Sequence, residues 1–294
     1  MLLIKQLFKK ILPFRYISLI AMYIVGAGLV QYVQNLRHWF VFFQGLFFLI
    51  FVSLSIDLIT LLIQINTQSG QFNALPIEDR KQNRLSLAII SAALLTVASV
   101  ILVDWIVKEI LWQGLFFLIF TYGFTGLFTI IVKLNKRIKN YQILFETIIF
   151  VIIPPAFAYF LQSDDPHRLL TMVVLSLIPA FIAYRLLSQL IAFNRNPNSG
   201  NHELIQAIGW EHSMVIHNAL ILCTFLLFAL VTLFGYPWFL IWPVFLALPI
   251  GLLEIWLMER VRRGEKPIWK IMQVSTACIY FLPMYLIGFA FWIR

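Results

Sequence analysis

Two ionisable side chains, Asp57 and Arg185, lie inside long apolar stretches of the sequence. A charge in hydrocarbon costs a few kcal/mol, so an ionisable residue there needs a partner or water and marks a candidate site. Each lies about eight residues before the end of its stretch, a depth of about 12 Å at 1.5 Å per residue. Equal depth predicts that the two side chains meet, either as a structural ion pair that fixes helix packing or as polar groups of a ligand site.

Three further polar side chains lie near the same predicted membrane face. Glu146 and Glu254 are each within about two helical turns of the same predicted membrane face, so they either join the first pair or reach the interface. His217 lies about one turn into another apolar stretch. No second His or Cys stands beside it at metal-ligand spacing, which favours a structural hydrogen bond for His217.

The composition identifies the solvent around these side chains. Of 294 residues, 61% are apolar and 12% are charged, against about 25% charged in ordinary soluble domains. The mean hydropathy is +0.89, and the apolar runs are about 20 residues long, the length of a membrane-spanning helix. The sequence therefore predicts an all-α polytopic membrane protein with one domain over residues 1–294. Cys223 and Cys278 fall within apolar segments and are expected to be small core side chains.

A span-length window predicts nine transmembrane helices. An amphipathic stretch with Lys5, Lys9 and Lys10 precedes them, and no small-residue cleavage site follows the first apolar run. Residues 1–15 are therefore predicted to be an interfacial segment and not a removable signal peptide. The predicted spans are 16–34, 39–65, 86–106, 112–132, 141–162, 168–193, 213–234, 237–258 and 270–292.

Basic residues predict the orientation of these helices. Seventeen Lys and Arg residues fall on one membrane face and four on the other, and the richer face is cytoplasmic by the positive-inside rule. This places the N-terminus and the long connections 66–85 and 194–212 in the cytoplasm and the C-terminus outside. The net charge of +9 thus reflects loop charge beside a lipid bilayer, with no nucleic-acid partner expected. Long loops in compact folds are usually functional, which favours a functional role for these two connections. The alternative interpretation is that they are disordered tethers, which have a similar composition.

Short motifs occupy both long connections and the fifth predicted span. They are Ala74-Leu75-Pro76 in the first connection, Gly200, Leu204 and Ile208-Gly209 in the second, and Glu146 followed by Pro154-Pro155 in the span. With nine helices, a cytoplasmic N-terminus and long loops after the second and sixth helices, the chain resembles the UbiA superfamily of membrane prenyltransferases, nearest its menaquinone-type branch. The resemblance implies a helical bundle around a central cavity.

The resemblance also implies Mg²⁺-dependent prenyl transfer, but this chain lacks the aspartates that would hold the metal. Family members ionise a polyprenyl diphosphate with Mg²⁺ held by two aspartate motifs, at the ends of the second and sixth helices. When Gly200 is aligned, Ala192 and Asn196 stand at the aspartate positions of the second motif, and no acid lies between Leu58 and Ile77, where the first motif is expected. A hard cation on diphosphate requires carboxylate oxygens. We therefore expect Mg²⁺-dependent prenyl transfer to be lost.

Without that transfer, the resemblance implies a protein that binds an isoprenoid lipid, a quinone or a pigment in the cavity, or a structural subunit of a larger membrane complex. Other membrane-protein subunits are then the expected partners besides lipid, and no metal or other cofactor is expected. The degenerate motif positions are Ala192, Asn196 and Gly200. The candidate polar residues of the cavity are Asp57, Arg185, Glu146, Asn194, His202 and Gln64.

Two alternatives remain open. The first is an active prenyltransferase with an atypical site and Mg²⁺ as its cofactor. Acids of the two long connections would act there with basic residues, since Arg and Lys can hold phosphate. The residues are Glu78, Asp79, Glu203 and Glu211, with Arg80, Arg84, Arg137 and His202. The segment from Glu78 to Lys81 is, however, better explained as the start of a helix, with acids in its first turn. The second alternative is an unrelated transporter whose path is lined by the interior charges, although the sequence lacks matched Gly or Pro interruptions in its two halves.

Overall fold

The computed structural model describes residues 13–34, 38–67, 77–110, 112–135, 141–196, 203–234 and 236–293. Every regular element within these ranges is helical, and nine stretches are long and apolar enough to cross a membrane. The nine predicted spans are confirmed to within a few residues. The observed spans are Phe14–Gln34, Trp39–Ile63, Arg84–Val107, Gln113–Val132, Gln142–Phe160, Arg168–Arg195, Trp210–Leu233, Trp238–Arg262 and Trp269–Ile293.

The fifth and eighth spans are each built from several consecutive helical segments, and the other seven are single helices. The elements are α2 (Pro13–Gln34), α3 (Trp39–Thr67), α4 (Ile77–Val107), α5 (Gln113–Leu134), α6 (Gln142–Thr147), the π-helix η2 (Ile148–Ile152), α7 (Ile153–Phe160), α8 (Arg168–Arg195), α9 (Glu203–Ile208), α10 (Trp210–Leu233), α11 (Trp238–Ile241), the 3₁₀-helix η3 (Trp242–Ala247), α12 (Leu248–Arg262) and α13 (Trp269–Ile293).

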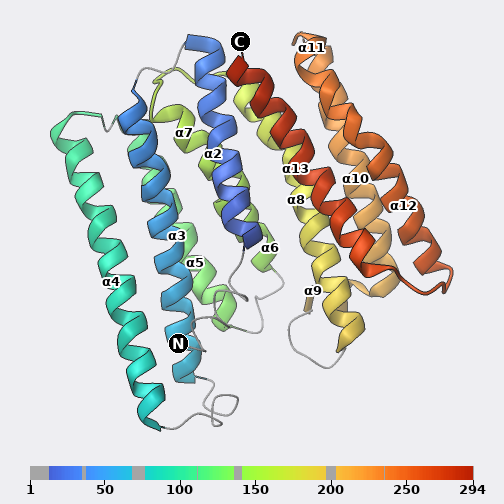
Figure 1. Cartoon of the computed structure of the whole chain (residues 1–294), viewed down its shortest axis with the longest axis horizontal. Helices are drawn as coiled ribbons and strands as arrows, with labels where there is room; N and C mark the ends of the chain where they lie inside the picture. Colours follow the sequence, from blue (N-terminus) through green and yellow to red (C-terminus); the bar gives the residue numbers. More distant parts are fainter. Residues whose placement is uncertain are drawn as a thin grey trace.

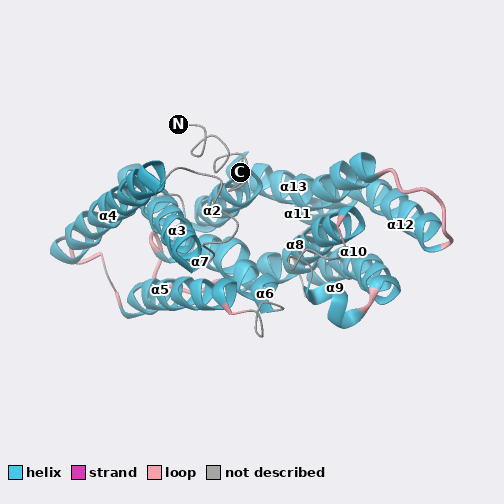
Figure 2. Cartoon of the chain, turned by 90° about the horizontal axis from the view of Figure 1, so that it is seen from below, coloured by secondary structure: helices cyan, strands magenta, loops and turns pink. Residues whose placement is uncertain are grey.

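The helices form two layers of one bundle (Figures 1 and 2). One layer runs α4, α3, α2, α13 and α12, and the other runs α5, α6 with α7, α8 and α10. Contacts of α2 with α7, α8 with α13 and α10 with α12 join the layers. We call the membrane side at which α3, α8 and α12 end the basic face.

Burial differs greatly between the spans, and the difference locates the centre of the bundle. In the most apolar windows of the fifth and sixth spans, 67% of the residues are buried inside the protein, against 17% in the third span. The third span therefore presents most of its surface outward, as a lipid-facing helix does. Polar side chains on the fifth and sixth spans, in contrast, must find partners within the protein.

Prolines explain the irregular fifth span and one of its partners. Pro154 and Pro155 lack N–H groups, so the carbonyls one turn earlier lose their helical hydrogen bonds. The chain relaxes there into the π-helix η2. The hydroxyl of Ser18 on α2 donates to the carbonyl of Phe150 at 3.3 Å, which satisfies one acceptor freed in this way. The first span is thus tied to the interrupted backbone of the fifth.

Gly26 permits this close approach of α2 to α7. A Cβ atom at Gly26 would overlap the backbone of Pro155, which cannot move aside as a flexible side chain can. The absence of a side chain at Gly26 therefore sets the spacing between the first and fifth spans, about two helical turns along α2 from the hydrogen bond of Ser18.

The two long connections are partly helical. α4 begins at Ile77, which confirms that the segment from Glu78 to Lys81 starts a helix. In the second connection, α9 is a short helix that Gly209 separates from α10 with φ of +92°, a conformation that favours glycine. Residues 1–12, 68–76, 136–140 and 197–202 lie outside the described residues, and so do the predictions for the N-terminal segment, Ala74-Leu75-Pro76, Gly200 and His202.

Candidate functional site

A buried carboxylate, Glu146 of the fifth span, binds charged groups of two other spans. Its side chain is 0% exposed, and the Nη2 atom of Arg185 on α8 lies 2.6 Å from Glu146 Oε2. Arg15, in the first turn of α2, forms an ion pair with Glu146 Oε1. Gln142, one turn earlier on α6, donates a hydrogen bond to the same oxygen at 2.7 Å. We call Arg15, Glu146 and Arg185 the arginine site.

Aromatic packing positions the two arginines of this site. Phe14, next to Arg15, stacks on Tyr184, next to Arg185, with ring centroids 3.5 Å apart and planes 9° from parallel. This stack holds the start of α2 against α8. The guanidinium of Arg15 also lies 5.9 Å from the centre of the Phe150 ring, a cation–π distance. The aromatic stack and the cation–π contact therefore hold both arginine side chains beside Glu146.

Asp57 lines a small cavity that borders the arginine site. The hydroxyl of Tyr16 donates to Asp57 Oδ2 at 3.1 Å. Asp57 and Glu146 both line the cavity, together with Ser53, Thr129 and Phe150 among others. Its volume is about 10 Å³, which is room for one water molecule at most. Adjacent residues of α2, Arg15 and Tyr16, thus bind the two carboxylates separately.

The direct pair predicted between Asp57 and Arg185 is therefore wrong. Arg185 binds Glu146 instead, because the fifth span lies between the second and sixth and presents its own acid to the sixth. Glu146 is predicted near the same membrane face, whereas Arg15 belongs to the predicted interfacial segment 1–15. Arg15 lies two residues after Pro13, a residue favoured at the first position of a helix, and this is the signal that would have assigned Arg15 to the span.

A second buried carboxylate, Glu254, lies in the C-terminal half. Its side chain and that of His217 are both 0% exposed, with His217 Nε2 at 3.9 Å from Glu254 Oε1. The hydroxyl of Ser275 on α13 donates to Glu254 Oε2. We call His217, Glu254 and Ser275 the histidine site. The prediction that Glu254 joins the Asp57–Arg185 pair or reaches the interface is thus corrected, because α12 packs on α10 and α13, in the other half of the bundle.

The remaining predicted residues are described only in part. Ala192 lies half-buried in the last turn of α8, and Asn196 follows that helix as its exposed C-cap. Asn194 is exposed, so it does not line the small cavity. Gln64 lies on α3, with a side chain outside the described ones.

Neither site has the make-up of a metal centre. Within the described ranges, no three His, Cys, Asp or Glu side chains converge as metal ligands. Cys223 and Cys278 are free thiols, both half-buried. The chemistry available at the arginine site is instead charge pairing and hydrogen-bond donation by two guanidinium groups.

Comparisons of this chain with known protein-family models and with curated proteins found no match. The class of protein therefore rests on its own helices, and these define an integral multi-pass membrane protein. The resemblance to the UbiA superfamily stays a prediction.

Proposed function

We propose that this chain is a UbiA-like membrane protein that binds an isoprenoid lipid or quinone beside the arginine site and does not perform Mg²⁺-dependent prenyl transfer. The observation that carries the proposal is the meeting of Arg15 and Arg185 at the buried Glu146. A buried ion network is an expensive way to pack helices, because apolar side chains of similar volume often give equal or greater stability. Intramembrane charges of this kind more often mark a binding site.

The two arginines retain hydrogen-bonding capacity for a ligand. The buried Nε atoms of Arg15 and Arg185 make no hydrogen bond within the described part of the chain. Guanidinium donors suit acceptor oxygens such as quinone carbonyls or phosphates. The small cavity at Asp57 is too narrow for such a group. The polar head of the ligand would therefore approach the arginines from the side on which they are 13% and 19% exposed.

The proposal is tested by the lipid that accompanies the protein. We expect an isoprenoid lipid or quinone to copurify from native membranes, identified by mass spectrometry of the extracted protein. Arg185→Gln and the charge-conserving Arg185→Lys should both reduce its amount, because Lys lacks the planar fork of donors. Arg168→Gln, at the exposed start of the same helix, is the matched control and should retain the lipid. Equal isoprenoid content in all variants, or phospholipid alone in the wild type, would refute the proposed site.

A turnover assay tests the catalytic half of the proposal. Purified protein with Mg²⁺, a series of polyprenyl diphosphates and aromatic acceptors should form no product above background, because Ala192 and Asn196 carry no carboxylate. Transfer that disappears in Glu203→Gln or Glu78→Gln would instead support an active prenyltransferase with an atypical site.

The proposal includes an orientation with the basic face in the cytoplasm. Glu265, in the connection between α12 and α13, and Asp164, between α7 and α8, are exposed at opposite ends of their spans. In a background without Cys223 and Cys278, a cysteine at 265 should react with an impermeant reagent only from inside and a cysteine at 164 only from outside. The reverse pattern would overturn the orientation.

A further inference from the structure

The histidine site leaves buried polar atoms without partners. Both ring nitrogens of His217 and Oε1 of Glu254 make no hydrogen bond within the described ranges. The distance of 3.9 Å between His217 Nε2 and Glu254 Oε1 is longer than a good hydrogen bond, which reaches about 3.2 Å. A small side-chain movement would bring the two atoms within hydrogen-bonding distance. Each unmet polar atom has lost its hydrogen bonds to water without a replacement, which destabilises the folded protein. A purely structural contact between these helices would not retain such atoms, since apolar groups would pack there at lower cost.

Within the described ranges, no lysine or arginine forms an ion pair with Glu254. Among the described ion pairs, His217 is its one ionisable neighbour. On the packed elements around it, α13 offers the hydroxyl of Ser275, the segment η3 has no ionisable residue, and Arg185 on α8 is engaged by Glu146. The charge of the site is therefore set by protons on His217 and Glu254 alone. One additional proton brings this pair from a net charge of −1 to zero, and a neutral site is favoured within a membrane bundle.

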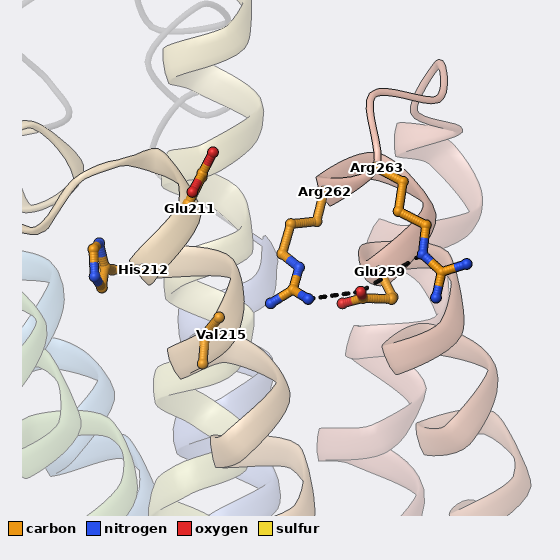
Figure 3. Close-up of a pocket in the computed structure, with 6 residues that line it drawn as sticks. All are labelled: Glu211, His212, Val215, Glu259, Arg262 and Arg263. Atoms are coloured by element: carbon orange, nitrogen blue, oxygen red, sulfur yellow. Dashed lines mark hydrogen bonds and ion pairs between the residues drawn. The ribbon is translucent and has the colours of Figure 1, made fainter.

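A polar pocket opens at the basic face above the histidine site. It has a volume of about 690 Å³ and lies between the start of α10 and the end of α12 (Figure 3). Its walls are Glu211, His212, Val215, Glu259, Arg262 and Arg263. Glu259 accepts from Arg262 Nη2 at 2.8 Å on the α12 side of the pocket.

The pocket lies within about two helical turns of the buried pair. Val215 precedes His217 by two residues on α10, and Glu259 follows Glu254 by five on α12, or about 3 and 7 Å along the axes. Buried Met214 and Met258 pack in the cluster between them. Methionine side chains are unbranched and adaptable, so brief entry of water past them requires little rearrangement.

We propose that His217 and Glu254 form a proton-binding site that exchanges protons with water at the basic face through the pocket between α10 and α12. The pair takes up one proton from water, either on Nε2 of the neutral imidazole or on Oε1 of the carboxylate, and holds it in a hydrogen bond between these two atoms. The Ser275 hydroxyl stabilises the carboxylate through the other oxygen. The histidine site is separate from the arginine site, so this proposal does not depend on the proposed isoprenoid ligand.

Infrared difference spectroscopy of the full-length protein in lipid nanodiscs, recorded between about pH 5 and pH 8, tests the site. We expect carboxyl signals that titrate and that are lost in Glu254→Gln. His217→Gln keeps hydrogen bonding but removes the second protonation position, so the midpoint of the Glu254 signal should fall by about one pH unit, a tenfold lower proton affinity. Ser275→Ala removes a donor to the carboxylate and should move the midpoint in the opposite direction.

Glu259→Gln, in the pocket wall but outside the buried pair, is the matched control and should leave the titrating Glu254 signal in place. Transfer to D₂O should shift the signal of the protonated carboxyl, as expected for exchange with water through the pocket. The proposal is overturned if Glu254→Gln removes no titrating signal, or if neither His217→Gln nor Ser275→Ala moves its midpoint. Opposite shifts in the two variants also exclude a general loss of folding as the cause.

Discussion

Glu146 and Glu254 are both fully buried glutamates, yet the protein surrounds them differently. Glu146 lies between two guanidinium groups from the first and sixth spans. One carboxylate oxygen of Glu254 accepts a hydrogen bond from the Ser275 hydroxyl, and the other lies 3.9 Å from the His217 imidazole nitrogen. Arginine keeps its charge under all ordinary conditions, whereas histidine and glutamate can both change theirs. The first arrangement therefore requires a charged carboxylate, and the second can adjust its charge by exchanging a proton.

The contrast also separates two mechanical roles. The arginine site joins α2, α6 and α8 at the centre of the bundle, where the spans are most buried. The histidine site joins α10, α12 and α13 beneath an open polar pocket. Loss of the carboxylate should thus be much more damaging in the first site than in the second.

The largest effect is expected from Glu146→Gln. The variant leaves Arg15 and Arg185 close together without their carboxylate, and breaking a buried pair in this way costs about 3–5 kcal/mol. The free energy of unfolding in mixed detergent micelles measures the loss. Glu259→Gln, which removes only exposed ion pairs with Arg262 and Arg263, is the control and should cost at most about 1 kcal/mol. A loss of similar size in both variants would contradict the prediction that the buried ion pairs of Glu146 stabilise the fold more than exposed ones do.

An intermediate effect is expected from Tyr16→Phe, which removes the hydroxyl that donates to Asp57. A hydrogen bond to a charged group contributes about 1.5–3 kcal/mol, and the phenyl ring preserves the packing. The same unfolding measurement applies, with Tyr285→Phe, an exposed tyrosine of α13, as the control. If Tyr16→Phe is neutral, Asp57 is not stabilised from α2, and the second carboxylate of the cavity is independent of the first span.

The smallest effect is expected from Glu254→Gln. The amide oxygen can still accept from Ser275 and the amide nitrogen can donate toward His217, so the loss should be on the order of 1 kcal/mol. It should be largest at low pH and diminish as the pH rises, because the buried carboxyl is more stable neutral than charged, so its ionisation destabilises the native site. Unfolding measured at two pH values provides the check. A loss as large as that of Glu146→Gln, and independent of pH, would show that both glutamates are fixed charges.

Much of the fold could be predicted because hydropathy and helix-start signals are local. The apolar runs identified all nine spans found in the described residues, and the acids after Ile77 identified the start of α4. The interrupted fifth span could be suspected from Pro154-Pro155, but the hydroxyl of Ser18 that compensates it could not, since the two segments are 132 residues apart.

The candidate sites were predicted less well than the helices. Asp57, Arg185 and Glu146 were selected as interior polar residues, because any ionisable group in an apolar run needs a partner, and the structure buries Asp57 and Glu146. Their pairing was wrong, since depth alone does not determine which faces of which helices meet. Arg15 was missed because its charge lies at the boundary of a span, where loop and interior residues look alike.

The sequence by itself determined that this chain spans a membrane, where its helices lie and that Asp57 and Arg185 lie within its apolar spans. These properties follow from local composition, since each helix satisfies its own backbone in lipid. Only the tertiary structure decided the partner of each charge, because that depends on the rotation and lateral order of the helices in two layers. It is the placement of the fifth span between the second and the sixth that assigned Arg185 to Glu146.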